Sequence, residues 1–146
     1  MPSKIKSATF VTLQFVFLGY LLLTTNIYGI NIFSVFLISL GGFVGMWAIY
    51  TMRKSVLRIT PDVDKKATLV ADGPYRFIRH PMYLALIVAG LGLLLSNMTV
   101  IRIFVYLFLI ADLLFKLNFE ERLLDGHFKN YKKYKEKTFK VIPYVY

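Results

Sequence analysis

The densest group of polar and aromatic side chains lies at residues 68–83, which read TLVADGPYRFIRHPMY. Asp72-Gly73-Pro74 predicts a turn, and Pro81 can occupy the first position of a helix. His80 would then be the N-cap residue, and Tyr83 would lie in the first turn. The unpaired N–H groups and the positive dipole end of such a helix favour a carboxylate or another electron-rich group. The run therefore predicts a helix N-terminus, here called the helix mouth, that could bind a ligand's carboxylate.

A second candidate is the acidic pair Glu120-Glu121. Two adjacent carboxylates offer charge complementarity to a cationic cofactor and acceptors for its hydroxyl groups. The apolar positions that follow have helical spacing, at residues 123, 124, 128, 131 and 134. We expect this tail to be an amphipathic helix along a membrane surface, where its lysines would meet anionic headgroups. The structural alternative is that both glutamates belong to a solvated face.

Composition limits the protein class in which these groups can work. The 146 residues are 57% hydrophobic and 18% charged, with mean hydropathy +0.58, a composition that excludes a disordered chain and argues against a single soluble domain. The chain has no cysteine, which excludes disulfides and cysteine-based metal sites. His80 and His127 are its two histidines and make a poor metal site.

Four apolar stretches are long enough to cross a bilayer, at about 7–25, 30–52, 81–97 and 99–119. We therefore expect an all-α integral membrane protein of one domain, with a loop at 53–80 and a tail at 120–146. The short turns near 26–29 and 97–99 predict two antiparallel hairpins. Seventeen of the eighteen Lys and Arg residues then fall on one side of the membrane. The positive-inside rule assigns that side, with both termini, to the cytoplasm, so the basic charge needs no nucleic acid to explain it.

Several residues within these stretches have two interpretations. Five glycines favour close helix packing, with a cofactor groove as the alternative: Gly41, Gly42, Gly45, Gly90 and Gly92. Arg102 lies near the outer end of its helix, where its side chain can snorkel. Asp112 and Lys116 share a helical face, so they either neutralise each other or act at a functional site. In the 68–83 run, Arg79 could be a positive-inside residue, and Tyr75 and Tyr83 interfacial aromatics.

The order of these motifs resembles the membrane methyltransferase family that contains isoprenylcysteine carboxyl methyltransferase and phospholipid N-methyltransferases. The resemblance covers about the last 80 residues. It is carried by Thr68-Leu69-Val70, Gly73 with Tyr75, Arg79-His80-Pro81 with Tyr83, a membrane hairpin, Glu120-Glu121, and Tyr131 with Tyr134 before Ile142-Pro143. Three positions depart from the family pattern: Lys116 stands near where carboxyl methyltransferases have arginine, Ala85 where glycine is usual, and Ala67 where some relatives have histidine.

The resemblance implies an enzyme that transfers a methyl group from S-adenosylmethionine, at the cytoplasmic face, to a lipid-like acceptor. It implies a cofactor site formed by Leu69, Val70, Tyr75, Arg79, His80, Pro81, Met82, Tyr83, Glu120 and Glu121. The two glutamates would also be the catalytic residues. Lys116 would bind the acceptor, near the position where carboxyl methyltransferases of the family have arginine.

The acceptor remains open at this point. The basic residue Lys116 before the acidic pair favours a prenylcysteine-type carboxylate or thiol as the acceptor. The short four-helix architecture favours a phospholipid amine of the phosphatidylethanolamine type. A non-catalytic scaffold or transporter is the alternative from another class. A four-helix exporter would be expected to have an acidic residue deep in its first helix, and none lies between Ser7 and Thr25. The oligomeric state is not indicated by the sequence.

Overall fold

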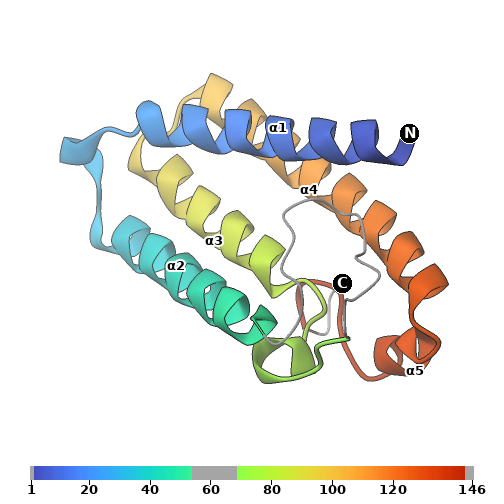
Figure 1. Cartoon of the computed structure of the whole chain (residues 1–146). Coiled ribbons are helices and arrows are strands. Elements are labelled where there is room, and N and C mark those ends of the chain that lie inside the picture. The colour runs from blue at the N-terminus through green and yellow to red at the C-terminus, as the bar shows by residue number, and fades with distance from the viewer. Residues whose placement is uncertain (1, 54–68, 144–146) are drawn as a thin grey trace.

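The computed structural model describes residues 2–53 and 69–143. Thr68, Ala67 and most of the basic residues of the 53–80 loop lie outside the described residues. The described part consists mainly of helices (Figure 1). These are α1 Pro2–Leu23, η1 Ile27–Gly29, α2 Ile32–Met52, η2 Gly73–Arg76, α3 Pro81–Ser96, α4 Val100–His127 and α5 Tyr131–Lys135.

The helix starts follow from local capping chemistry. The side-chain oxygen of Asn31 accepts a hydrogen bond from the Ser34 backbone N–H at 2.8 Å, which caps α2. Thr99 caps α4 in the same way. Pro81 begins α3 with His80 as its N-cap residue, as the sequence predicts. Polar residues therefore occupy the N-cap positions of three of the four long helices.

The helices pair differently from the prediction. We expected α1 and α2 to form an antiparallel hairpin, but α1 packs mainly against α4, and α2 packs mainly against α3 (Figure 1). Small residues explain this choice: a Cβ atom on Gly41 would lie 2.6 Å from the Ala85 carbonyl oxygen, and one on Gly92 would lie 2.8 Å from the Ser34 carbonyl oxygen. The single glycine of α1, Gly19, has no such close neighbour.

Helix packing also accounts for two more of the five glycines. Gly45 faces the Ala85 methyl group, and Gly90 faces Tyr106 of α4. Gly42 differs, because a Cβ atom there would meet nothing within 4 Å. The packing interpretation therefore holds for four positions, and Gly42 faces outward.

The outer surface is apolar. Two of the described helical stretches, Ile5–Leu23 and Ile32–Met52, are long and apolar enough to cross a membrane. Large side chains on these helices and on α4 point away from the protein, among them Phe15, Phe36, Trp47, Phe104 and Phe108. An exposed apolar surface of this kind indicates a membrane or protein interface. The α3 helix is also apolar but has 16 residues.

Charged side chains within the bundle point inward. The Arg102 side chain is 1% exposed, and its guanidinium donates hydrogen bonds to the Leu21 and Leu93 carbonyl oxygens and to Thr24. The prediction that Arg102 snorkels toward solvent is therefore wrong: three nearby oxygens at the helix ends accept hydrogen bonds from its two terminal nitrogens inside the protein, while its buried Nε atom has no hydrogen-bond partner among the described residues. It links α1 to α3 and α4.

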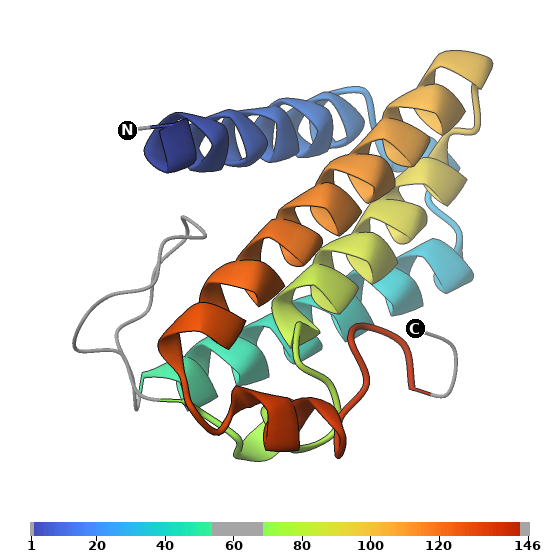
Figure 2. The same ribbon diagram turned by 90° about the vertical axis from the view of Figure 1, so that its right-hand side faces the viewer.

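The region after residue 119 also departs from the prediction. The α4 helix continues through Glu120-Glu121 to His127, and between there and residue 143 only the five residues of α5 are helical. The chain then turns back, as Figure 2 shows, and forms a parallel bridge between Ile78 and Phe139. The tail is therefore not one amphipathic helix along a surface. Backbone donors in the segment before α3 bind it: the Arg79 N–H reaches the Phe139 carbonyl at 2.8 Å.

Candidate functional site

The candidate site lies at the end of the bundle where α3 begins and where α4 leaves the bundle. His80 makes no side-chain capping bond, so its ring is free to face α4. The ring is 7% exposed and stacks on Tyr83, with centroids 5.4 Å apart and planes 6° apart. The N-cap position thus presents an aromatic pair at the helix mouth.

The acidic pair meets this aromatic pair. The His80 Nδ1 atom lies 3.6 Å from Glu120 Oε2, and its Nε2 atom lies 3.4 Å from Glu121 Oε1. Tyr83 also interacts electrostatically with Glu120. Two motifs that are about 40 residues apart in the sequence therefore form one cluster. Their order along the chain had suggested a common site, and the geometry is consistent with it.

Glu121 is the more firmly held of the two carboxylates. Arg79 Nε donates to its Oε1 at 2.6 Å, and both side chains are largely buried. Burial raises the pKa of Glu121, but the hydrogen bonds from His80 and Arg79 outweigh this and lower it to about 2. Glu121 is therefore ionised at neutral pH.

Arg79 also ties the tail to the site. Its guanidinium donates to the Lys135 carbonyl oxygen at 3.2 Å and to the Thr138 carbonyl oxygen. These bonds occupy the guanidinium within the protein, so in this structure Arg79 orients Glu121 and the tail. Thr138 also accepts from Arg79 through its hydroxyl oxygen at 3.3 Å, and sequence reasoning did not identify it.

Two buried tyrosines, Tyr75 and Tyr131, and the half-buried Tyr134 connect the tail to the rest of the site. The Tyr134 hydroxyl donates to the Tyr75 carbonyl oxygen at 2.6 Å, and the Tyr131 hydroxyl lies 3.5 Å from Glu121 Oε1. Burial raises the pKa of Tyr134 to about 12 and those of Tyr75 and Tyr131 further above their ordinary value. All three hydroxyls therefore stay protonated and can donate.

The loop before α3 is fixed on the other side by α2. Gly73 has φ +54°, and a Cβ atom there would lie 2.6 Å from Thr51 Oγ1. Val70 and Tyr75 pack with Ala48, and Met82 borders the same cluster. Val70 and Tyr75, two of the predicted cofactor residues, are therefore largely occupied in packing, and Leu69 beside them is half-buried.

Lys116 lies one helical turn before Glu120 and is 2% exposed. Its Nζ atom sits 5.1 Å from the centre of the Tyr83 ring and donates to Gln14 Oε1 of α1 at 2.9 Å. No ion pair joins Lys116 to Asp112, so the direct neutralisation that their spacing allows does not form. Asp112 instead has a buried Oδ2 atom without a hydrogen-bond partner. Gln14 was missed, although a lone amide in an apolar span is a visible signal.

The predicted residues therefore fall into two groups. His80, Tyr83, Glu120, Glu121 and Arg79 form one contiguous cluster with Lys116 beside it, and Leu69, Val70 and Tyr75 lie toward α2. Pro81 starts the helix, and Met82 packs between the two groups. Within the described residues, no three His, Cys, Asp or Glu side chains are grouped to hold a metal ion.

Comparison with known proteins gives one match. A family model described as phospholipid methyltransferase matches residues 30–131. That stretch contains α2, α3, α4 and every residue of the cluster above, and it begins well before the residues that carried the sequence resemblance. No curated protein and no solved structure matches the chain. Because the match covers more than half of the sequence, the chain belongs to the phospholipid methyltransferase family of membrane methyltransferases.

Proposed function

We propose that this protein is a membrane enzyme that methylates the amine of a phospholipid headgroup, with S-adenosylmethionine as the methyl donor. The observation that carries the proposal is the cluster of His80, Tyr83 and Glu120 at the mouth of α3, in a chain of this family. The family name favours the phospholipid acceptor, which the sequence alone ranked second.

The residues present fit such a donor. Glu120 is the less engaged carboxylate, since its closest described charge partner, His80 Nδ1, is 3.6 Å away and its side chain is 19% exposed. It can accept hydrogen bonds from hydroxyl or ammonium groups. The Met82 N–H, in the first turn of α3, bonds to no backbone carbonyl of the described residues and can donate to a carboxylate. Together these groups match a ligand with a carboxylate, hydroxyls and positive charge.

When bound, S-adenosylmethionine supplies a methyl group on a sulfonium sulfur. Transfer breaks a carbon–sulfur bond, forms a carbon–nitrogen bond and releases one proton from the amine. Glu120 and His80 are the groups of the cluster that can accept this proton. The remaining work of the protein is alignment of the reactants and exclusion of water, which the packed tyrosines and the folded-back tail favour.

We further propose that α1, α2, α3 and α4 all cross the membrane, with the cluster and both termini on the cytoplasmic side. The buried positions of Arg102, Asp112 and Lys116 support a span by α4, because charged groups in a bilayer face the protein interior. The basic residues near the cluster support the cytoplasmic assignment.

The first test is calorimetric titration of the detergent-purified protein with S-adenosylmethionine and S-adenosylhomocysteine. We expect saturable binding that weakens at least tenfold in Glu120→Gln and His80→Ala. Glu136→Gln, an exposed acidic residue beyond α5, is the matched control and should bind normally. Absence of binding by folded wild-type protein would overturn the assignment of the donor, and unchanged affinity in both site variants would overturn the site.

A prenylcysteine-type carboxylate or thiol is the second candidate acceptor. The buried ammonium of Lys116 beside Tyr83 favours it, because a cation can pair with an anionic acceptor. Transfer of labelled methyl groups to phosphatidylethanolamine or to a farnesylated cysteine, measured side by side, separates the two. If Lys116 binds the acceptor, Lys116→Ala should raise the acceptor's KM more than the donor's.

A further inference from the structure

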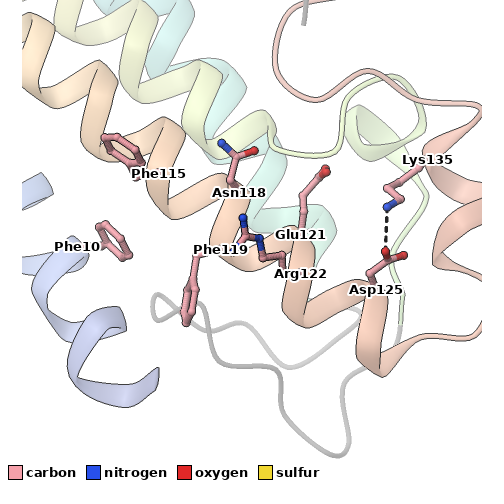
Figure 3. Close-up of a pocket in the computed structure, with 8 residues that line it drawn as sticks. All are labelled: Phe10, Phe115, Asn118, Phe119, Glu121, Arg122, Asp125 and Lys135. Carbon is pink, nitrogen blue, oxygen red and sulfur yellow. Dashed lines mark hydrogen bonds and ion pairs between the residues drawn. The ribbon is translucent and has the colours of Figure 1, made fainter. Parts of the chain in front are cut away.

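An open groove of about 470 Å³ lies between the N-terminal part of α1 and the last turns of α4 (Figure 3). Its walls differ in character. Phe10 of α1 and Phe115 and Phe119 of α4 form an apolar wall, with the Phe10 and Phe119 ring centres 6.2 Å apart. Polar residues of α4 and α5 form the rest, namely Asn118, Glu121, Arg122, Asp125 and Lys135.

The charges of the groove are unequally engaged. Lys135 pairs with Asp125 at 3.1 Å, and Glu121 is held by Arg79. Arg122 is exposed and takes part in no hydrogen bond or ion pair with the residues that the structure describes. The groove thus presents one available guanidinium beside two carboxylates.

We propose that this groove binds a phospholipid with an amine headgroup, with its phosphate on Arg122 and its acyl chains along the phenylalanines. A guanidinium can bind two phosphate oxygens at once, and this geometry makes arginine a strong phosphate partner. The volume is in the range of small-molecule pockets, enough for a headgroup and the first part of the chains. The proposal rests on the proposed function, because it names the site that would hold the acceptor.

Two observations favour an amine headgroup over a purely anionic lipid. The carboxylates of Glu121 and Asp125 line the same groove as Arg122, so a positive group next to the phosphate meets acceptors. A second negative charge would face these carboxylates, and the other cation of the groove, Lys135, already pairs with Asp125. Glu121 also contacts His80 at 3.4 Å. An amine placed toward Glu121 is therefore directed to the candidate site.

The test uses photoreactive phosphatidylethanolamine, with the reactive group on an acyl chain, and purified protein in detergent micelles. We expect crosslinks that map to α1 near Phe10 and to α4 between Phe115 and Arg122. Arg122→Gln should reduce the crosslinking at least tenfold, since a hydrogen bond to a charged group is commonly worth that factor. Arg76→Gln, an exposed arginine outside the groove and near the start of α3, is the control and should crosslink as the wild type does.

Competition with unlabelled lipids tests the headgroup. Phosphatidylethanolamine should compete well, phosphatidylglycerol weakly because it lacks the amine, and diacylglycerol least because it also lacks the phosphate. Equal competition by phosphatidylglycerol would overturn the amine assignment, and equal crosslinking of wild type and Arg122→Gln would overturn the site. Titration of the same preparations with S-adenosylmethionine distinguishes failure of this proposal from failure of the proposed function. If wild type and Arg122→Gln both bind S-adenosylmethionine and crosslink equally, the lipid groove is refuted and the donor assignment is not.

Discussion

At the scale of single residues, the ion pair between Arg79 and Glu121 joins three segments that are distant in the sequence. It links the residue before His80 to α4, and Arg79 extends the connection to the tail through the carbonyl oxygens of Lys135 and Thr138. A buried ion pair is costly to break on one side, because the partner is left as an uncompensated charge. The stability of the site should therefore depend on this pair.

We predict that Glu121→Ala lowers the free energy of unfolding by about 3–5 kcal/mol, because it leaves the Arg79 guanidinium buried without its carboxylate. Thermal unfolding in detergent, followed by circular dichroism, measures the effect. Glu136→Ala removes an exposed acidic side chain and should change stability by less than about 0.5 kcal/mol. Equal losses in the two variants would show that the pair contributes nothing specific.

The same carboxylate predicts a dependence on pH. The pKa of Glu121 is about 2 in the folded protein and 4.5 ordinarily, so folding favours its ionised form. The resulting stabilisation is fully present above about pH 5, decreases as the pH falls through 4.5, and is lost near pH 2. The difference in stability between wild type and Glu121→Gln should shrink over this range. A difference that stays constant between pH 6 and pH 3 would contradict the assignment.

The residue types of the site could be read from the sequence, but their partners could not. His80, Tyr83 and Glu120 stand out because a proline, a turn and an acidic pair mark them. That Glu121 rather than Glu120 would be the carboxylate held by Arg79 depends on how α4 is rotated about its axis. The bond from Lys116 to Gln14 depends on which helix α1 packs against, and that was not predicted correctly.

At the scale of elements, close approach between helices decides which of them are neighbours. The loop lengths suggested that α1 and α2 pair, whereas α2 uses Gly41 and Gly45, with Gly92 of α3, to pack against α3. Lipid gives no hydrophobic drive for helix association, so backbone proximity and van der Waals contact determine the arrangement. Turn length alone carried too little information to predict it. Helix positions followed well from hydropathy and capping residues.

Gly41 and Gly42 form a matched pair for testing this interpretation. A Cβ atom on Gly41 would lie 2.6 Å from the Ala85 carbonyl oxygen, whereas one on Gly42 would meet nothing within 4 Å. We predict that Gly41→Val lowers the free energy of unfolding by about 1–3 kcal/mol or more, because the helices must separate. Gly42→Val should change it by less than about 1 kcal/mol. Unfolding of both variants in the same detergent provides the comparison, and similar losses would refute the α2–α3 contact.

At the scale of the whole molecule, two of the buried polar clusters lie at opposite ends of the bundle. Arg102 joins α1, α3 and α4 at one end, and the cluster of His80, Glu120 and Glu121 joins α3, α4 and the tail at the other. The apolar outer surface lies between them. This separation is what a protein crossing a bilayer requires, because lipid can satisfy no polar group on the outer surface.

The absence of cysteine from the chain allows this arrangement to be tested with single introduced thiols. Tyr28 and Met98 are exposed at the connections α1–α2 and α3–α4, and Lys137 is exposed in the tail. If four helices cross the membrane, Tyr28→Cys and Met98→Cys should react with a membrane-impermeant maleimide added outside intact cells. Lys137→Cys should react only after the cells are opened, since the positive-inside rule assigns the basic tail to the cytoplasm. Labelling of Tyr28→Cys and Met98→Cys from opposite sides would exclude four membrane-crossing helices, and labelling of Lys137→Cys in intact cells would reverse the orientation of the site.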